Sequence, residues 1–125
     1  MIAKKPTIVI YTHRADEALL KEVCAGIEEE GVLYEIAPHT CGAAGELSEA
    51  ACDTSMLGVG IGMDGIEVSL HIKGMNFRHG DAEKTALFSL HSPDAAAARA
   101  LGANGARVIK KLPLRLTHES VDDFH

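Results

Sequence analysis

The chain has 125 residues, of which 46% are hydrophobic and 24% charged, so it has the length and composition of one globular domain. Its net charge of −6 and its 4% of aromatic residues exclude the positive surface and the stacking platform of a nucleic-acid binder. No apolar run reaches the roughly 18–20 residues of a membrane span, and no signal-peptide core follows Met1–Pro6. The cysteines are odd in number and fit a reducing cytosol; they are Cys24, Cys41 and Cys52.

The first half of the chain predicts two strand–helix units. Thr7–Tyr11 is a β-branched run typical of a buried strand. A helix follows over Asp16–Glu30, because its apolar residues recur at helical spacing, and Gly31 ends it. We then expect a second strand over Val32–Ile36 and a weaker helix over Glu46–Cys52.

The second half predicts three strands in succession. Leu57–Ile61 forms the third strand, and Met63–Gly65 forms a turn with an Asp-Gly hairpin signal. Ile66–Ile72 alternates apolar and polar residues, which indicates a strand antiparallel to the third. Ala86–His91 forms the fifth strand.

The last helix has the clearest predicted start. Ser92 is a favourable N-cap, Pro93 suits the first helical position, and Asp94 complements the positive end of the helix dipole. The helix is expected to run to about Lys111, because Pro113 prevents its continuation.

The element order β-α-β-α-β-β-β-α predicts the fold class. Right-handed βα crossovers make the first strands parallel, and the hairpin adds one antiparallel strand. We therefore expect an α/β three-layer sandwich with a mixed, mostly parallel five-stranded sheet, similar to an anticodon-binding domain. The chain is read as a single domain with an ordered core over residues 7–115 and a loose tail over 117–125.

The glycines Gly58, Gly60 and Gly62 resemble part of a dinucleotide-binding fingerprint. That fingerprint requires a helix directly after the glycines to receive the pyrophosphate. A turn and a strand follow here, so the favoured interpretation is that the glycines let a helix pack closely over the sheet.

The segment His39–Gly42 contains an H-x-x-G element. Cobalamin-binding domains use D-x-H-x-x-G, in which the aspartate orients the ligating histidine; Ala37 occupies the aspartate position here. Zinc binding by His39 with Cys41, or by Cys41 with Cys52, lacks a supporting spacing. The favoured interpretation is a histidine in a surface loop. The other histidines, among them His13, His71, His79 and His91, share no periodicity.

Three carboxylates, Glu28, Glu29 and Glu30, occupy the last turn of the first helix. The helix dipole is negative there and like charges repel, at about 0.3–1 kcal/mol for each exposed group. The helical wheel turns Glu29 most nearly away from the core stripe that includes Ile27. A divalent cation or a basic partner would offset this cost, and a solvated acidic helix end is the alternative.

The last helix carries small residues at Ala98, Gly102 and Gly105 or Ala106. Because glycine costs about 1 kcal/mol in a helix interior, the stripe indicates close backbone approach, either to the chain's own sheet, which is favoured, or to a partner. We expect the basic residues of this helix to be solvated; they are Arg99, Arg107, Lys110 and Lys111.

Taken together, these segments resemble a known family. The segments are Gly26–Gly31, Gly58–Ile61, Ala86–Leu90, Ala98–Lys110 and Leu112–Arg115. In order and spacing, over about Thr7–Arg115, they are similar to the small (beta) subunit of the reactivating factor of coenzyme B12-dependent diol and glycerol dehydratases, a family like the dehydratase medium subunit. The stretch 74–84 and the tail after Arg115 are longer than the family pattern.

The resemblance implies a non-catalytic, chaperone-like role. The partner is expected to be a large subunit with ATPase activity and an Hsp70-like core, and the small subunit would exchange transiently with the dehydratase large subunit so that damaged cobalamin leaves. The resemblance also implies that Glu29 ligates a divalent cation, Mg²⁺ or Ca²⁺, at the interface with the large subunit, with Glu28 and Glu30 beside it. It implies no cofactor on the isolated chain, no nucleic-acid or membrane partner, and a cytoplasmic location with or without a bacterial microcompartment.

Two other functions stay open. The chain could be the medium subunit of the dehydratase itself, although that subunit normally carries additional chain. It could instead be a small-ligand-binding α/β domain that uses the loop at His39–Gly42.

Overall fold

The computed structural model describes residues 6–73 and 85–110. The elements follow the order predicted from the sequence; they are β1 (Ile8–His13), α1 (Glu17–Glu29), β2 (Tyr34–Pro38), α2 (Ala44–Thr54), β3 (Val59–Asp64), β4 (Glu67–Lys73), β5 (Thr85–His91) and α3 (Ala95–Ile109). The predictions for the loop 74–84 and the tail 117–125 lie outside the described residues.

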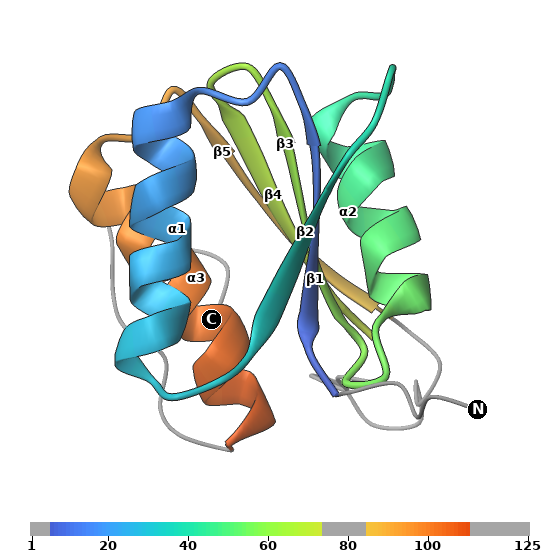
Figure 1. Cartoon of the computed structure of the whole chain (residues 1–125), viewed down its shortest axis with the longest axis vertical. Helices are drawn as coiled ribbons and strands as arrows, with labels where there is room; N and C mark the ends of the chain where they lie inside the picture. The colour runs from blue at the N-terminus through green and yellow to red at the C-terminus, as the bar shows by residue number, and fades with distance from the viewer. Residues whose placement is uncertain (1–5, 74–84, 111–125) are drawn as a thin grey trace.

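The five strands form one open sheet in the order β2-β1-β3-β4-β5. β1 is parallel to both β2 and β3, and β4 is antiparallel to both β3 and β5. Four strands therefore share one direction and β4 alone is reversed. Helices α1 and α3 lie on one side of the sheet and α2 on the other (Figure 1), which confirms the three-layer α/β sandwich with a mixed sheet.

The glycines of β3 bring α2 onto the sheet. A Cβ atom at Gly60 would overlap the backbone of Cys52, and one at Gly62 would overlap the backbone of Ala44 and Ser48. The close-packing interpretation of this glycine pattern is thus confirmed. A strand follows the glycines, so the site that a dinucleotide would need at a helix N-terminus is missing after them.

Glycines also join the two helices on the opposite face. A Cβ at Gly26 of α1 would overlap the carbonyl of Arg99, and one at Gly102 of α3 would overlap the carbonyl of Val23. Gly105 faces the sheet side chains Leu70 and Val59 instead. The prediction that the stripe packs on the sheet was therefore right for Gly105 and wrong for Gly102, which contacts α1.

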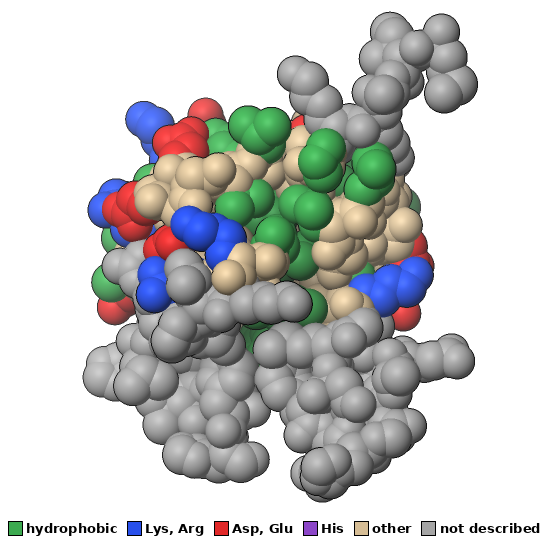
Figure 2. Space-filling view, turned by 90° about the horizontal axis from the view of Figure 1, so that it is seen from below, with side chains coloured by type: hydrophobic (Ala, Val, Ile, Leu, Met, Phe, Trp, Pro, Cys, Tyr) green, Lys and Arg blue, Asp and Glu red, His purple; other side chains and the backbone are tan. Residues whose placement is uncertain are grey.

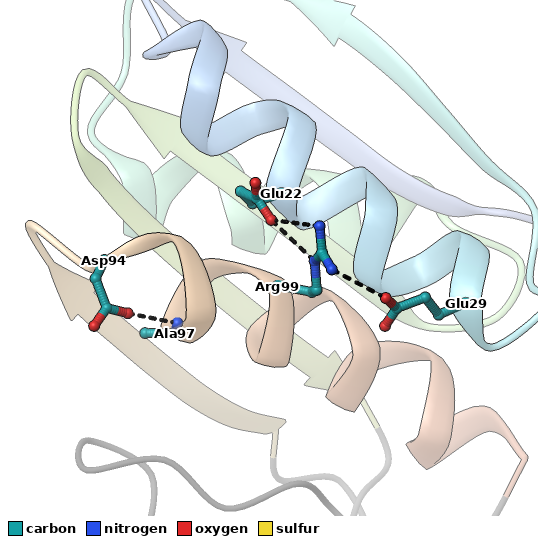
Figure 3. A network of polar contacts seen from close by, with 5 residues as sticks. All are labelled: Glu22, Glu29, Asp94, Ala97 and Arg99. Carbon is teal, nitrogen blue, oxygen red and sulfur yellow. Dashed lines mark hydrogen bonds and ion pairs between the residues drawn. The ribbon is translucent and has the colours of Figure 1, made fainter.

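Several predicted boundaries needed correction. The N-cap of α3 is Asp94, whose side chain accepts from the N–H of Ala97 at 2.7 Å (Figure 3), whereas Ser92 has a left-handed φ of 52°. Asp94, which precedes four alanines, is the cap because its carboxylate reaches the free amides of the first helical turn. The β3–β4 turn is Gly65-Ile66 rather than Met63–Gly65, since β3 continues to Asp64 and Gly65 takes the φ of +61°. The helix predicted over Glu46–Cys52 begins two residues earlier and ends two later.

Figure 2 views the end of the molecule at which β1 begins. Hydrophobic side chains gather in its middle, with charged side chains at both margins. The exposed Leu33 and Met56 precede β2 and β3 at this end. The glutamates of α1 lie near the start of β2, at the amino ends of the parallel strands. His13, Asp64 and His39 lie at the opposite, carboxyl ends, where ligand sites of α/β folds are usually found.

Candidate functional site

The last turn of α1 presents the three glutamates that the sequence singled out. The helix ends because Gly31 adopts a left-handed φ of +76° and its N–H donates to the carbonyl of Glu28 at 3.0 Å. Each of the three carboxylates then takes a different direction and a different partner.

Glu29 shares a cation with an earlier residue of the same helix. The guanidinium of Arg99 on α3 lies between Glu22 and Glu29 (Figure 3). It contacts Glu22 Oε1 through Nε and Nη2, both at 2.9 Å, and Glu29 Oε2 through Nη1 at 3.3 Å. Arg99 thus holds Glu22 firmly and Glu29 more loosely.

Glu30 is bound by the end of α3. Its Oε2 accepts from Arg107 Nη1 at 2.6 Å, and Lys110 Nζ donates to its backbone carbonyl at 2.7 Å. Only 13% of the Glu30 side chain is exposed. The expectation of solvated basic residues on α3 was wrong for Arg107, whose side chain is only 25% exposed. Arg99 and Lys110 keep 42% of their side chains exposed, as expected, but the close α1–α3 packing also brings them to the carboxylates. Lys111 lies outside the described residues.

Glu28 faces away from α3, toward β2. The hydroxyl of Tyr34 donates to its Oε2 at 2.6 Å, and this carboxylate raises the pKa of Tyr34 because it stabilises the protonated phenol. Beneath them, burial raises the pKa of the Cys24 thiol. Tyr34 is therefore held as a neutral donor.

The glutamate segment has limited capacity for a metal ion. The Glu29 side chain is 44% exposed at the helix end, and a carboxylate is a ligand that Mg²⁺ and Ca²⁺ accept. Among residues 6–73 and 85–110, no three His, Cys, Asp or Glu side chains come together to hold a metal ion. The described residues therefore do not form a metal site by themselves, and Glu29 offers a single carboxylate at this helix end.

The fold and this segment can now be compared with known proteins. The family described as dehydratase medium subunit matches residues 5–115, which includes every described element. The chain belongs to the dehydratase medium subunit family. Within this family it is similar to the small subunits of dehydratase-reactivating factors.

Two curated relatives of this family cover nearly the whole chain. The propanediol dehydratase-reactivating factor small subunit of Salmonella typhimurium is 34% identical over 114 residues, 90% of this chain and 93% of the relative. The diol dehydratase-reactivating factor small subunit of Klebsiella michiganensis is 33% identical over 111 residues, 88% of this chain and 84% of the relative. The correspondence is thus close to end to end.

Two solved structures of the family have the same fold. A chain of a diol dehydratase-reactivating factor complexed with ADP and Mg²⁺ aligns with a TM-score of 0.76 and 32% identity, covering 90% of this chain and all of that one. A chain of a glycerol dehydratase reactivase aligns with a TM-score of 0.75 and 27% identity, covering 90% of this chain and 98% of that one.

The remaining predicted site of this family member, the loop at His39, lies after β2. The ring of the exposed His39 packs against that of Tyr11, with the centroids 4.1 Å apart and the ring planes tilted by 42°. Ala37, two residues earlier, offers no carboxylate. Cys41 is exposed, whereas Cys52 is buried and its thiol donates to the carbonyl of Gly58. Among the described residues, no three His, Cys, Asp or Glu side chains come together to hold a zinc ion.

A histidine–carboxylate pair was missed by the sequence reasoning. His13 Nδ1 lies 3.0 Å from Asp64 Oδ1, at the last residues of the adjacent parallel strands β1 and β3. The signal was available, since both residues directly follow apolar strand runs that a parallel register would align.

A groove runs along the outer side of α1, beside the edge strand β2. Its volume is about 620 Å³, and its apolar lining includes Leu20, Cys24, Ala25 and Ile36. No helix in the part of the chain that the structure describes is long and apolar enough to span a membrane.

Proposed function

We propose that this chain is the non-catalytic small subunit of a reactivating factor, which helps to release damaged cobalamin from an inactivated B12-dependent diol or glycerol dehydratase. The observation that carries the proposal is the nearly end-to-end correspondence, in sequence and in fold, with chains named as reactivating-factor and reactivase components. A fold shared with the dehydratase medium subunit family gives such a protein a surface with which to take that subunit's place.

In this proposal the chemistry lies in the partner. A large subunit with an Hsp70-like ATPase core hydrolyses ATP, and the small subunit leaves it to associate transiently with the dehydratase large subunit. The isolated small subunit binds neither cobalamin nor nucleotide. The proposal places the protein in the cytoplasm, with a bacterial microcompartment as one setting of the client enzyme.

Glu29 is proposed as one ligand of a divalent cation, Mg²⁺ or Ca²⁺, shared with the large subunit. Support comes from its exposure, since 44% of the Glu29 side chain is exposed against 13% of the Glu30 side chain. When bound, the cation would supply an electrostatic bridge between the subunits. Arg99 could release Glu29 and keep both contacts to Glu22.

Co-expression with a reactivase large subunit, followed by size-exclusion chromatography with and without ADP, ATP and Mg²⁺, tests this function. We expect a stable complex. Glu29→Ala should weaken it about tenfold or more in the presence of Mg²⁺, whereas Glu28→Ala, the matched control, should weaken it less. Failure of the wild-type chain to associate would refute the function, and equal, negligible effects of the two variants would refute the metal ligand alone.

The dehydratase medium subunit itself is the second candidate, favoured by the description of the matching family. Co-expression with the large and small subunits of a dehydratase distinguishes it. A stable complex with lyase activity would support this candidate and exclude the first.

The third candidate, a small-ligand-binding domain, depends on the exposed His39. Cobalamin titration of the isolated chain tests it, with His39→Ala as the control. We expect no binding by either protein.

A further inference from the structure

The open edge of the sheet at β2 has backbone groups aimed outward at known positions. The N–H of Ile8 donates to Leu33 at 2.9 Å, and the N–H of His39 donates to Thr12 at 2.7 Å. Because alternate residues of a parallel strand bond to the same neighbour, the odd-numbered residues of β2 face β1. The backbone N–H and C=O groups of Ile36 therefore point to the open edge, where no described strand pairs with them.

The edge strand β2 is short and carries the exposed Glu35 and Pro38, which limit pairing, but Ile36 at its centre is open to another strand. Natural edges are often covered, charged or bulged. Here the Ile36 side chain is 43% exposed and borders the groove between α1 and β2. Pro38, which has no N–H to offer, limits the pairing only at the end of the strand.

The helix beside this edge carries opposite charges at the two ends of the groove. Lys21 and Glu28 both line it, and their separation of seven residues places them on the same face of α1, about 10 Å apart along the axis. Lys21 makes no ion pair within the described residues, and Glu28 meets only the neutral hydroxyl of Tyr34. Cys24 and Ala25, which also line the groove, lie between them in the helix.

Two copies of the chain related by a two-fold axis would place the open strand edge and the charged residues of α1 against their complements in the other copy. An axis perpendicular to the sheet at Ile36 makes the two β2 strands antiparallel, and the two Ile36 residues then exchange a pair of hydrogen bonds. The same rotation makes the two α1 helices antiparallel about the Cys24–Ala25 centre. Lys21 of each copy then faces Glu28 of the other.

We propose that a second copy of this chain docks on the β2 edge and the groove of α1, forming a symmetric dimer with one continuous ten-stranded sheet. The interface is isologous, so each favourable contact occurs twice. Glu29 itself does not line the groove, but Arg99, which contacts it, does. The dimer is therefore tested on the isolated chain and through Lys21, so that its failure would not bear on the proposed contact with the large subunit.

Sedimentation velocity of the isolated chain over a range of concentrations tests the proposal. We expect a reversible monomer–dimer equilibrium. Lys21→Glu places four carboxylates at the two contacts and should weaken dimerisation about tenfold or more, because opposing like charges are strongly unfavourable across an interface. The exchange variant Lys21→Glu/Glu28→Lys should restore it.

Ile36→Pro removes an outward N–H while sparing the bonds to β1, and it should also abolish the dimer. Leu87→Lys on the opposite edge strand, where Leu87 is 50% exposed, is the matched control and should leave the equilibrium unchanged. A wild-type chain that is monomeric at every concentration would overturn the proposal, and so would a dimer insensitive to the charge exchange. If the amides of β2 become protected from hydrogen exchange only after the large subunit is added, the edge binds that partner instead and the proposal is overturned.

Discussion

On both sides of the sheet, glycines allow backbones to approach closely. The two sides differ in which elements the glycines bring together and in which side chains surround the contact. On the α2 face the glycines lie in β3, and the helix rests directly on the strand. On the other face they lie in α1 and α3, and ion pairs from Arg99 and Arg107 follow the seam between the two helices. The difference indicates that the α2 face is structural, whereas the α1 face combines packing with an exposed polar surface.

The largest effect is expected from a substitution that disrupts the contact between α2 and β3. In Gly60→Ala the new methyl group would overlap the backbone of Cys52, and neither strand nor helix can yield without losing contacts. We expect the free energy of unfolding to fall by about 3 kcal/mol or more, measured by urea denaturation.

Gly45→Ala is the matched control on the same face. A Cβ at Gly45 meets nothing within 4 Å, and alanine is the better helix former. Stability should stay constant or rise by a few tenths of a kcal/mol. An equal loss in both variants would mean that the contact with β3 is not the cause.

A smaller loss of stability is expected when an ion pair between α1 and α3 is removed, and it should exceed the loss caused by removing an ordinary surface ion pair. Arg99→Gln removes a guanidinium that joins Glu22 and Glu29, and we expect a loss of about 1 kcal/mol, given the partial exposure of all three groups. The control is Lys73→Gln, which removes a pair with Asp53 at 3.5 Å whose side chains are 57% and 65% exposed.

The Lys73 variant should be indistinguishable from wild type in urea denaturation. Added salt should reduce the difference in the free energy of unfolding between Arg99→Gln and wild type, because mobile ions screen the ion pairs between α1 and α3. A salt-independent difference would point to packing of the arginine stem rather than to its charge.

The smallest expected effect is a pH dependence of the free energy of unfolding, caused by Cys24 in the lining of the α1 groove. Burial raises the pKa of Cys24 above its ordinary value of 9.0, so near that pH the folded chain binds a proton that the unfolded chain has lost. The contribution of Cys24 to the free energy of unfolding should therefore be constant below about pH 8 and decrease as the pH rises through 9.

Cys24→Ala should flatten that decrease relative to wild type, in denaturant titrations at pH 7 and pH 10. Cys41→Ala is the control, since Cys41 is exposed. A decrease that the Cys24 variant does not alter would show that other groups cause it.

Much of the fold was predictable because local signals and the global fold agree. Helix α1 begins after Asp16 and ends before Gly31, close to the predicted bounds. The alternation of apolar and polar residues in β4 correctly predicted the second strand of the hairpin. The start of α3 was misassigned because Ser92 and Asp94 are both capable caps and only tertiary placement selects between them. The partners of the glutamates were not predictable, because they depend on how closely two glycines let α1 approach α3.

The central claim is that this chain supports reactivation and does not catalyse a reaction itself. The most direct test incubates a dehydratase that holds an inactive cobalamin with ATP, Mg²⁺ and the reactivase large subunit, and measures the cobalamin released, with and without this chain. We predict release that requires both subunits and regain of activity after intact adenosylcobalamin is added. Release that is equally fast without this chain would contradict the account.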